Sequence, residues 1–154
     1  MDTDMKVQKL ANGYVIDHVP AGNGLVLAKV LDLTTTNGGT LLVGTNLASG
    51  KHGRKDIIKM EDRTLTEEEE SKVALVAPNA TVSIIRDYKV AEKRTLRIPE
   101  AVEDLIRCPN PRCITRLEPR QSFTVEGTDP VLVRCRYCER TLQGNEVGEN
   151  IVPG

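Results

Sequence analysis

The sequence predicts an α+β fold in two parts, a ferredoxin-like antiparallel sheet with two helices and then a small all-β domain built around cysteines. Two observations support this. Strand-like and helix-like segments follow one another in the order β-α-β-β-α-β, with one further strand, up to about residue 95. All four cysteines come later, between residues 108 and 138. We therefore predict domains at 1–98 and 99–154.

The first half of the pattern follows from apolar alternation and turn residues. Alternating, β-branched residues predict a strand over 14–19, and the Pro-Ala-Gly-Asn-Gly turn after it leads to a helix over 25–33. A second strand is predicted over 40–46. A loop over 47–53 then leads to a third strand over 55–61.

The second helix has the clearest start signal in the chain. Thr66 and Glu69 have the spacing of a capping box, and four consecutive glutamates place negative charge at the positive end of the helix. The helix continues through Val76 and stops before Pro78. Strands are predicted over 81–87 and 88–96.

The connection between the domains and the end of the chain are less regular. Pro99 stands at a plausible first helical position, so residues 98–107 are predicted to form a short connecting helix. Residues 145–154 are expected to be a loose tail.

Composition limits the classes of protein that this chain can belong to. It has no Trp and one Phe, so its core must be assembled from small aliphatic residues, and a metal or partner would add stability. A formal charge of −1 argues against general attraction to nucleic acid or to an anionic membrane. No signal peptide or membrane-spanning stretch is recognisable, so we expect a cytoplasmic protein.

The cysteines have the spacing of a metal site. Four residues separate Cys108 from Cys113, twenty-one lie between the two pairs, and two separate Cys135 from Cys138. Two such short loops let four thiolates converge tetrahedrally on one structural Zn²⁺ per chain, with no position left for water. Two disulfides, a dithiol redox pair at Cys135 and Cys138, and an iron site are the alternatives.

Zinc ribbons commonly bind nucleic acid, but the charge here argues against it. Residues 100–154 carry seven Arg and Lys against nine Asp and Glu, a net charge of −2. Because four thiolates around a divalent ion add further negative charge, this domain is a poor phosphate binder. Contact with another protein is the better use of such a stiffened surface.

Lysines in the first domain suggest a site for an anion. Strand alternation places Lys55, Ile57 and Lys59 on one face of the sheet. Two ammonium groups around an apolar residue suit an anionic ligand with a planar part, such as a nucleoside triphosphate, and equally suit an ordinary solvated face. Asp17 and His18 are similarly ambiguous. No nucleophile motif, Walker A loop or acid–base set is present, which argues against an enzyme.

Several motifs in combination resemble a known family. They are Tyr14-Val-Ile-Asp-His-Val-Pro20, Leu47-Ala-Ser-Gly50 with Gly53-Arg-Lys-Asp-Ile-Ile-Lys59, Ala77-Pro-Asn-Ala-Thr-Val82, and the four cysteines. In this order, and over nearly the whole chain, they are similar to the regulatory chain of aspartate carbamoyltransferase, which belongs to pyrimidine biosynthesis.

The resemblance implies a non-catalytic subunit whose first domain binds the allosteric effectors CTP and ATP. It implies that Asp17 bonds the ribose, with Lys59 in the same region, and that His18 and Lys93 lie at the phosphates with Lys55 beside neighbouring anionic groups. The residues that would border the base or sugar are Leu10, Val15, Ile57, Ile85, Tyr88 and Val90. Ser83 stands where the family's best-known members have Asn, and Gln8-Lys9 replaces a Glu-Ala pair, so the effector preference does not carry over directly.

For the second domain, the resemblance implies a structural zinc and a contact with the catalytic chain through Asn110, Glu139 and Arg140. Regulatory chains of this family pair through their nucleotide domains and bridge two catalytic trimers. The expected assembly therefore holds six catalytic and six regulatory chains. In the expected mechanism, an effector binds two quaternary states of this assembly with different affinities and so shifts the equilibrium between them.

Two rival functions make different predictions. A zinc-ribbon adaptor in transcription or translation would bind nucleic acid with steep salt dependence. A thiol redox protein would need a metal-free, reactive Cys135 or Cys138, which tightly bound stoichiometric zinc would exclude.

Overall fold

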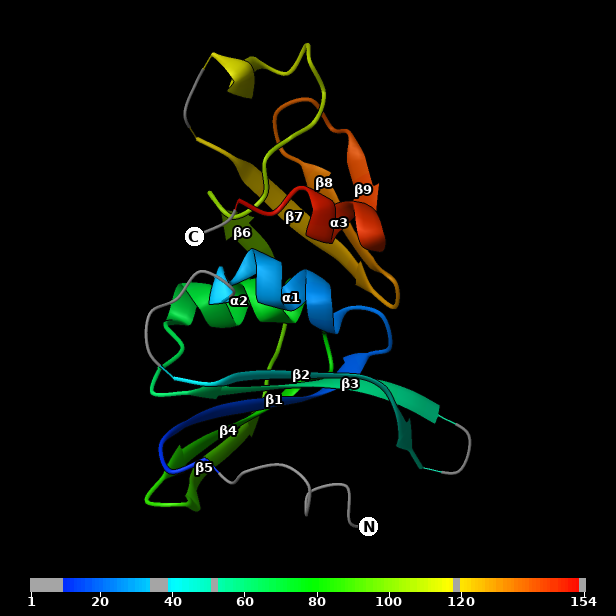
Figure 1. The fold of residues 1–154 in the computed structure, drawn as a ribbon. Helices are drawn as coiled ribbons and strands as arrows, with labels where there is room; N and C mark the ends of the chain where they lie inside the picture. The colour runs from blue at the N-terminus through cyan, green and yellow to red at the C-terminus, as the bar shows by residue number, and fades with distance from the viewer. Residues whose placement is uncertain (1–9, 34–38, 51–52, 118–119, 153–154) are drawn as a thin grey trace.

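The computed structural model describes residues 10–33, 39–50, 53–117 and 120–152, which form two antiparallel sheets with helices between them (Figure 1). The elements of the first sheet and its helices are β1 (Gly13–Pro20), α1 (Gly24–Val30), β2 (Leu41–Ser49), β3 (Gly53–Glu61), α2 (Glu67–Val76), β4 (Thr81–Arg86) and β5 (Lys89–Thr95). Those of the second part are β6 (Ala101–Glu103), the 3₁₀ helix η3 (Ile114–Arg116), β7 (Ser122–Thr128), β8 (Val131–Cys135), β9 (Thr141–Gln143) and α3 (Asn145–Glu149).

The first sheet has the strand order β2-β3-β1-β4-β5, and every neighbouring pair is antiparallel. Both α1 and α2 cover the same face of this sheet, on the side toward the second domain (Figure 1). The second sheet has the order β6-β7-β8-β9 and is also antiparallel. The predicted fold class, a ferredoxin-like sheet with two helices followed by a small β domain, is confirmed.

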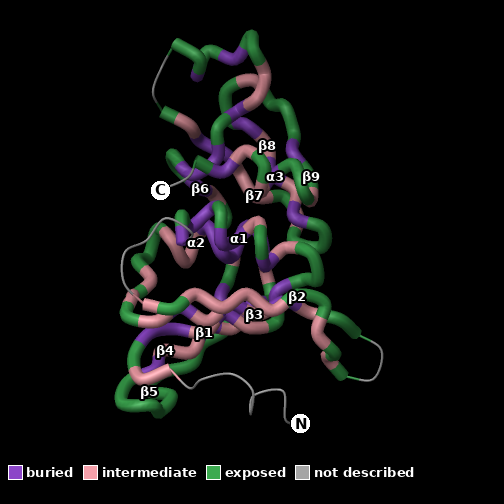
Figure 2. The backbone as a smooth tube through the Cα atoms, viewed as in Figure 1, coloured by how far each residue is buried: buried purple, intermediate pink, exposed green. Residues whose placement is uncertain are grey.

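The core lies between the first sheet and its two helices. Tyr14, Ile16 and Ile58 point inward from the central strands and are at most 1% exposed. Leu27 of α1 and Val73 of α2 meet them and are fully buried. Figure 2 shows this burial concentrated in the middle of the molecule, whereas β5 is exposed along its length. One face of the sheet is therefore closed by helices.

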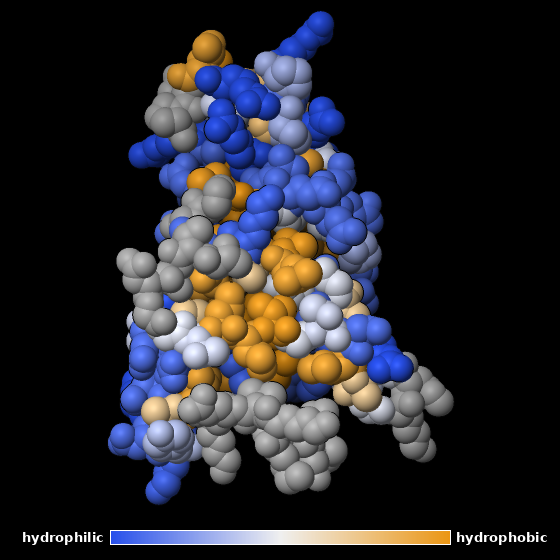
Figure 3. All heavy atoms as spheres, viewed as in Figure 1, coloured by the Kyte–Doolittle hydropathy of each residue, from blue (hydrophilic) through white to orange (hydrophobic). Residues whose placement is uncertain are grey.

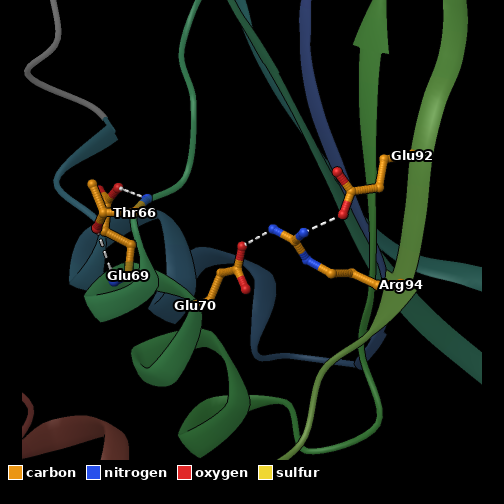
Figure 4. Close-up of polar contacts among 5 residues, drawn as sticks. All are labelled: Thr66, Glu69, Glu70, Glu92 and Arg94. Carbon is orange, nitrogen blue, oxygen red and sulfur yellow. Dashed lines mark hydrogen bonds and ion pairs between the residues drawn. The ribbon is translucent and has the colours of Figure 1, made fainter.

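The predicted capping box starts α2. Thr66 Oγ1 accepts a hydrogen bond from the Glu69 backbone N–H at 3.1 Å, and the Glu69 carboxylate accepts one from the Thr66 N–H at 3.0 Å (Figure 4). One turn further along, Glu70 pairs with Arg94 of β5, which also pairs with Glu92 (Figure 4). The helix start is thus capped locally and tied to the edge strand of the sheet.

The prediction of a connecting helix over 98–107 is wrong, because this segment joins the second sheet. Ala101–Glu103 forms β6, with Val102 opposite Phe123 of β7. Backbone hydrogen bonds extend the contact on both sides, from Val125 N–H to Glu100 O and from Asp104 N–H to Gln121 O, each at 2.8 Å. The open edge of β7 supplies partners that outweigh the local helical preference.

The C-terminal segment is not a loose tail within the residues described. Asn145–Glu149 forms α3, Val147 is fully buried, and Ile151 forms a β-bridge with Ile106. Gly148 faces the first domain, because a Cβ built on it would lie 3.2 Å from Val26 Cγ1 of α1 and 3.8 Å from Val76 Cγ2 of α2. This helix therefore packs the second domain onto the first.

The loop predicted over 47–53 is also shorter than expected. β2 continues to Ser49 and β3 begins at Gly53, with Leu47 opposite Lys55. A register shift between Gly44 and Leu47 lets β2 continue past an irregularity that the sequence pattern does not show.

The helices of the described ranges are all short. The longest, α2, has 10 residues, whereas about 20 apolar residues are needed to cross a bilayer. None of them is long and apolar enough to span a membrane.

A fully buried carboxylate, Asp56 of β3, ties three segments of the first domain together. Its Oδ2 accepts hydrogen bonds from the backbone N–H groups of Gly22 at 2.9 Å and Gly24 at 2.8 Å, at the entry to α1. Its Oδ1 accepts one from Asn46 in β2 at 2.8 Å. Gly24 is required here, since a Cβ at that position would lie 2.9 Å from Asp56 Oδ2.

We expect Asp56→Ala to lower the free energy of unfolding by about 3–5 kcal/mol, because it leaves three backbone N–H groups without an acceptor and opens a cavity. Since the chain contains no Trp, urea unfolding followed by circular dichroism is the suitable measurement. Glu68→Ala, at an exposed position of α2, is the control and should change stability little. A loss below about 1 kcal/mol for Asp56→Ala would contradict this role.

Candidate functional site

The four cysteines come together as predicted. The Sγ atoms of Cys108, Cys113, Cys135 and Cys138 all lie within 4.8 Å of one another. The Cys108–Cys138 and Cys113–Cys135 sulfur distances are 3.6 and 3.8 Å. Four thiolates placed tetrahedrally about 2.3 Å from a metal ion are separated by about 3.8 Å. The cluster therefore has the dimensions of a four-sulfur metal site.

The alternative of two disulfides does not fit this geometry. A disulfide requires sulfur atoms about 2.05 Å apart, and all four cysteines are free thiols. Cys108, Cys113 and Cys135 are buried and Cys138 is half-buried. Four protein ligands fill a tetrahedral shell, so an ion bound here has a structural role.

Two tight turns hold these cysteines in place. In the first, the Asn110 side chain accepts a hydrogen bond from the Arg112 N–H at 3.0 Å, and its backbone oxygen accepts one from the Cys113 N–H at 3.1 Å. In the second, Glu139 has φ 67° and donates its N–H to Cys135 O at 2.9 Å. Asparagine side chains commonly close turns of the first kind, and a left-handed residue closes the second.

Hydrogen bonds and burial affect the thiols differently. Burial raises the pKa of Cys108 to about 12 and is also the main cause that raises the pKa of Cys135. For Cys138 burial acts in the same direction, but hydrogen bonds from the Asn110 side chain and the Arg140 backbone outweigh it and lower the pKa to about 7. Thr115 also donates its hydroxyl to Cys113 Sγ at 3.0 Å, a contact that the sequence analysis missed.

The predicted interface residues lie at these cysteine turns. Asn110 is half-buried, and Glu139 and Arg140 are exposed. Large apolar side chains in or close after these turns face solvent: Ile114 and Leu117, at the two ends of η3, are 53% and 85% exposed, and Tyr137 of the second turn is 49% exposed. None of these three was predicted from the sequence.

The second predicted site lies on the sheet face opposite the helices. The strand register aligns Lys59 of β3, Val15 of β1, Ser83 of β4 and Lys93 of β5 as successive neighbours in one row. Leu42 of β2 extends the row beyond Lys59 and was not predicted. Paired residues of antiparallel strands present their side chains on the same face.

A β-bulge in β5 places Val90, the other predicted residue of that strand, on the same face as Lys93. Ile84 pairs with Glu92 but Ile85 pairs with Val90, so Ala91 is the extra residue. Val90 and Lys93 thereby share a face, although two residues lie between them and a regular strand would place them on opposite faces. Tyr88 and Val90 are 66% and 59% exposed at this end of the sheet.

Leu10 approaches the same end. The Tyr88 N–H donates to the backbone oxygen of the next residue, Ala11, at 3.0 Å, which places this segment beside the β4–β5 turn. Leu10 is half-buried there. Gln8-Lys9, which replaces the Glu-Ala pair of the family's best-known members, lies outside the residues that the structure describes.

Asp17 and Lys55 form an ion pair on this face. Lys55 Nζ lies 2.9 Å from Asp17 Oδ1 and 3.1 Å from Oδ2. Burial opposes ionisation of Asp17, but hydrogen bonds from Lys55 and from the His18 backbone N–H outweigh it and lower its pKa. Asp17 is therefore an anion at neutral pH. Ile57 lies between Lys55 and Lys59 on β3 and is half-buried.

His18 occupies a bulge in β1, with φ 61°. Its Nδ1 lies 3.1 Å from Thr81 Oγ1, and its side chain is exposed. The structure therefore brings the predicted polar and charged residues onto one open sheet surface. His18 lies at one end, Val15 and Ile57 lie among the charged residues, and Tyr88 and Val90 lie at the other end. Thr81 was not predicted.

Together, the two sites describe a protein with a four-cysteine cluster suited to a structural metal ion and an open sheet surface that carries lysine side chains. Comparison with known proteins supports this description. Residues 5–97 match the family model described as the aspartate carbamoyltransferase regulatory chain, allosteric domain, and residues 100–148 match the metal binding domain of the same chain.

Curated relatives match along almost their whole length. The aspartate carbamoyltransferase regulatory chain of Pyrococcus abyssi is 51% identical over 150 residues, covering 96% of this chain and 99% of the relative. The corresponding chain of Methanopyrus kandleri is 50% identical over 152 residues, covering 97% of each, and that of Thermococcus gammatolerans is 49% identical over 149 residues.

The protein is thus a regulatory, non-catalytic subunit with an allosteric domain and a metal-binding domain. It belongs to the family of aspartate carbamoyltransferase regulatory chains.

We expect metal binding to release about one proton fewer at pH 8 than at pH 6, because Cys138, with a pKa of about 7, is already largely thiolate at the higher pH. Calorimetric titration of the metal-free chain with Zn²⁺, in buffers of different ionisation enthalpy, measures this number. Asn110→Ala removes a hydrogen-bond donor to Cys138, so the pKa of Cys138 should rise and the drop in proton release should occur at higher pH. Equal proton release at both pH values would contradict the assignment.

Proposed function

We propose that this chain binds nucleoside triphosphate effectors, CTP and ATP, and transmits their effect to the catalytic chains of aspartate carbamoyltransferase in pyrimidine biosynthesis. In this proposal, residues 1–98 form the nucleotide-binding domain and residues 99–154 form the domain that contacts the catalytic chain. The whole assembly works in the cytoplasm.

The cationic row on the open sheet face is the observation that carries the nucleotide proposal. Lys59 and Lys93 are three strands apart, which corresponds to about 14 Å at the usual strand spacing. Positive charge spread over such a length suits an elongated ligand with several anionic and polar groups better than a single small anion. Lys55 adds a third ammonium group near the same face.

The proposed roles follow the arrangement of side chains. Asp17 accepts hydrogen bonds from the ribose in the region of Lys59, and His18, Lys93 and Lys55 serve the phosphates and neighbouring anionic groups. Apolar side chains border the base or sugar, namely Leu10, Val15, Ile57, Ile85, Tyr88 and Val90. Ser83 lies between Val15 and Lys93 in the row. Its single hydroxyl is shorter than the side-chain amide of the Asn found there in the family's best-known members, so a water molecule completes its contact with the nucleotide.

Zinc is the metal that best suits the four-cysteine centre. Four thiolates at tetrahedral separations suit Zn²⁺, which has no geometric preference of its own and needs no redox partner. Iron accepts the same ligands. In either case the ion crosslinks the two turns from which Asn110, Glu139 and Arg140 emerge.

We propose that this surface binds the catalytic chain. The exposed apolar side chains Ile114, Leu117 and Tyr137 lie among polar residues at the cysteine turns, and interfaces commonly combine an apolar centre with a polar rim. Through this contact, and through pairing of the nucleotide domains of two regulatory chains, six regulatory chains join two catalytic trimers. The packing of α3 against α1 and α2 gives the effector signal a route between the domains, and such coupling typically amounts to about 1–3 kcal/mol.

We expect the zinc-loaded chain to bind CTP and ATP saturably in calorimetric titrations, and a Lys59→Ala, Lys93→Ala variant to bind about 100-fold more weakly. The reason is that two charge-assisted hydrogen bonds, each worth about 1.5 kcal/mol, are lost. Lys89→Ala is the matched control, because Lys89 starts the same strand beside Val90 and faces the other way.

Absence of binding by the folded chain would leave it a structural bridge between catalytic trimers. It would also favour the rival hypothesis of a zinc-ribbon adaptor in transcription or translation. Unchanged nucleotide affinity in the Lys59→Ala, Lys93→Ala variant would show that the nucleotide binds elsewhere than on this face.

We expect removal of the metal by a chelator to release the catalytic chains, because the turns that carry the interface lose their crosslink. Size-exclusion chromatography of the assembled enzyme measures this as the appearance of free catalytic trimers. Cd²⁺, which also accepts thiolate ligands, should restore assembly. A metal-free chain that still assembles normally would refute the role of the metal in docking.

A further inference from the structure

A cavity lies between the two domains, on the opposite side of α1 from the nucleotide face. It has a volume of about 500 Å³, within the range of small-molecule sites. Its walls come from the entry to α1 and from α1 itself, from the end of α2, and from the segment around α3. Figure 3 shows hydrophobic side chains gathered in the middle of this face, over the helices between the two sheets.

The interior of this cavity is aliphatic. Val26 and Val30 of α1, Val76 of α2 and Ile151 after α3 line it. Val30, Val76 and Ile151 are at most 7% exposed, and Val26 is half-buried. The cavity therefore offers a surface for an aliphatic group of a few carbon atoms, and burial of such a group favours binding.

Two opposite charges stand at its opening, one from each domain. Lys29 belongs to the last turn of α1, and Glu149 is the last residue of α3; both are exposed and both line the cavity. Neither side chain forms a hydrogen bond or ion pair with any residue in the described part of the chain, and they do not pair with each other. An unpaired cation and an unpaired anion thus face the same apolar space.

Asn23, the N-cap residue of α1, adds a polar group to the lining of the cavity. Its Nδ2 donates to the backbone oxygen of Val76 at 3.1 Å, which fixes the side chain across the gap between α1 and α2. Its Oδ1 has no partner among the described residues and can accept a hydrogen bond from an ammonium group.

We propose that this cavity binds a small zwitterion with an aliphatic body, of the size and chemistry of a free branched-chain α-amino acid. The carboxylate pairs with Lys29, the ammonium group pairs with Glu149, and the aliphatic side chain lies against Val26, Val30 and Val76. A nucleotide does not suit this site, because one lysine beside one glutamate leaves no surplus of positive charge. Since the lining comes from both domains, the bound molecule stabilises their contact.

The test is methyl NMR of the zinc-loaded full chain, labelled at valine and titrated with L-leucine. We expect saturable shifts of the Val26, Val30 and Val76 methyl signals with a dissociation constant on the order of 1 mM. Lys29→Gln and Glu149→Gln, both at exposed positions that do not threaten folding, should each weaken binding about tenfold. Lys89→Gln and Glu68→Gln, at exposed positions outside the cavity, are the matched controls.

Two single-charge analogues separate the proposed ligand from a purely apolar one. Isopentylamine keeps the ammonium group and 4-methylpentanoate keeps the carboxylate, and both should bind at least about tenfold more weakly than leucine. Val26→Phe, which fills the cavity, should abolish the shifts. Absence of saturable shifts with leucine, equal binding of the analogues, or unchanged binding in both charge variants would overturn the proposal. CTP titration of the same samples reports separately on the sheet face.

Discussion

The first domain depends on the buried carboxylate of Asp56. This one side chain fixes the entry to α1 through Gly22 and Gly24 and fixes the irregular part of β2 through Asn46. An unsatisfied charge in a core would be costly, so the three backbone N–H groups must stay where they are. The neighbouring residue, Lys55, points to the other face and holds Asp17. The position of α1 and the charge pattern of the sheet face opposite the helices are thus set from adjacent residues of one strand.

The second domain is organised around a different constraint. Its sheet is small. Two cysteines lie in the loop between β6 and η3 and two at the end of β8 and the turn after it, so a bound ion adds a crosslink that the aliphatic core alone does not provide. The two domains nevertheless share one continuous apolar core, which runs from the first sheet through the helices to Phe123 and Val133. This continuity makes the contact between the domains a packed interface.

Local signals were sufficient for much of the fold, and long-range packing decided the rest. The capping box at Thr66 and the spacing of the cysteines depend on neighbouring residues, and both were predicted correctly. The segment around Val102 has apolar residues at helical spacing, but its place in the second sheet depends on the edge of β7, twenty residues away. Similarly, α3 is stabilised by Val26 and Val76, which are distant in sequence. Strand alternation predicted the face shared by Lys55 and Lys59, whereas the bulge at Ala91 that turns Lys93 to it leaves no simple sequence signal.

The position of α3 has a consequence for how the molecule is made. The chain leaves the ribosome from its N-terminus, and domains generally fold as they emerge. The first sheet and the cysteine turns precede residues 145–151 in the chain, yet this later segment packs the second domain onto the first. Docking of the two domains therefore waits for the synthesis of this segment, after the strands of the first sheet have been made.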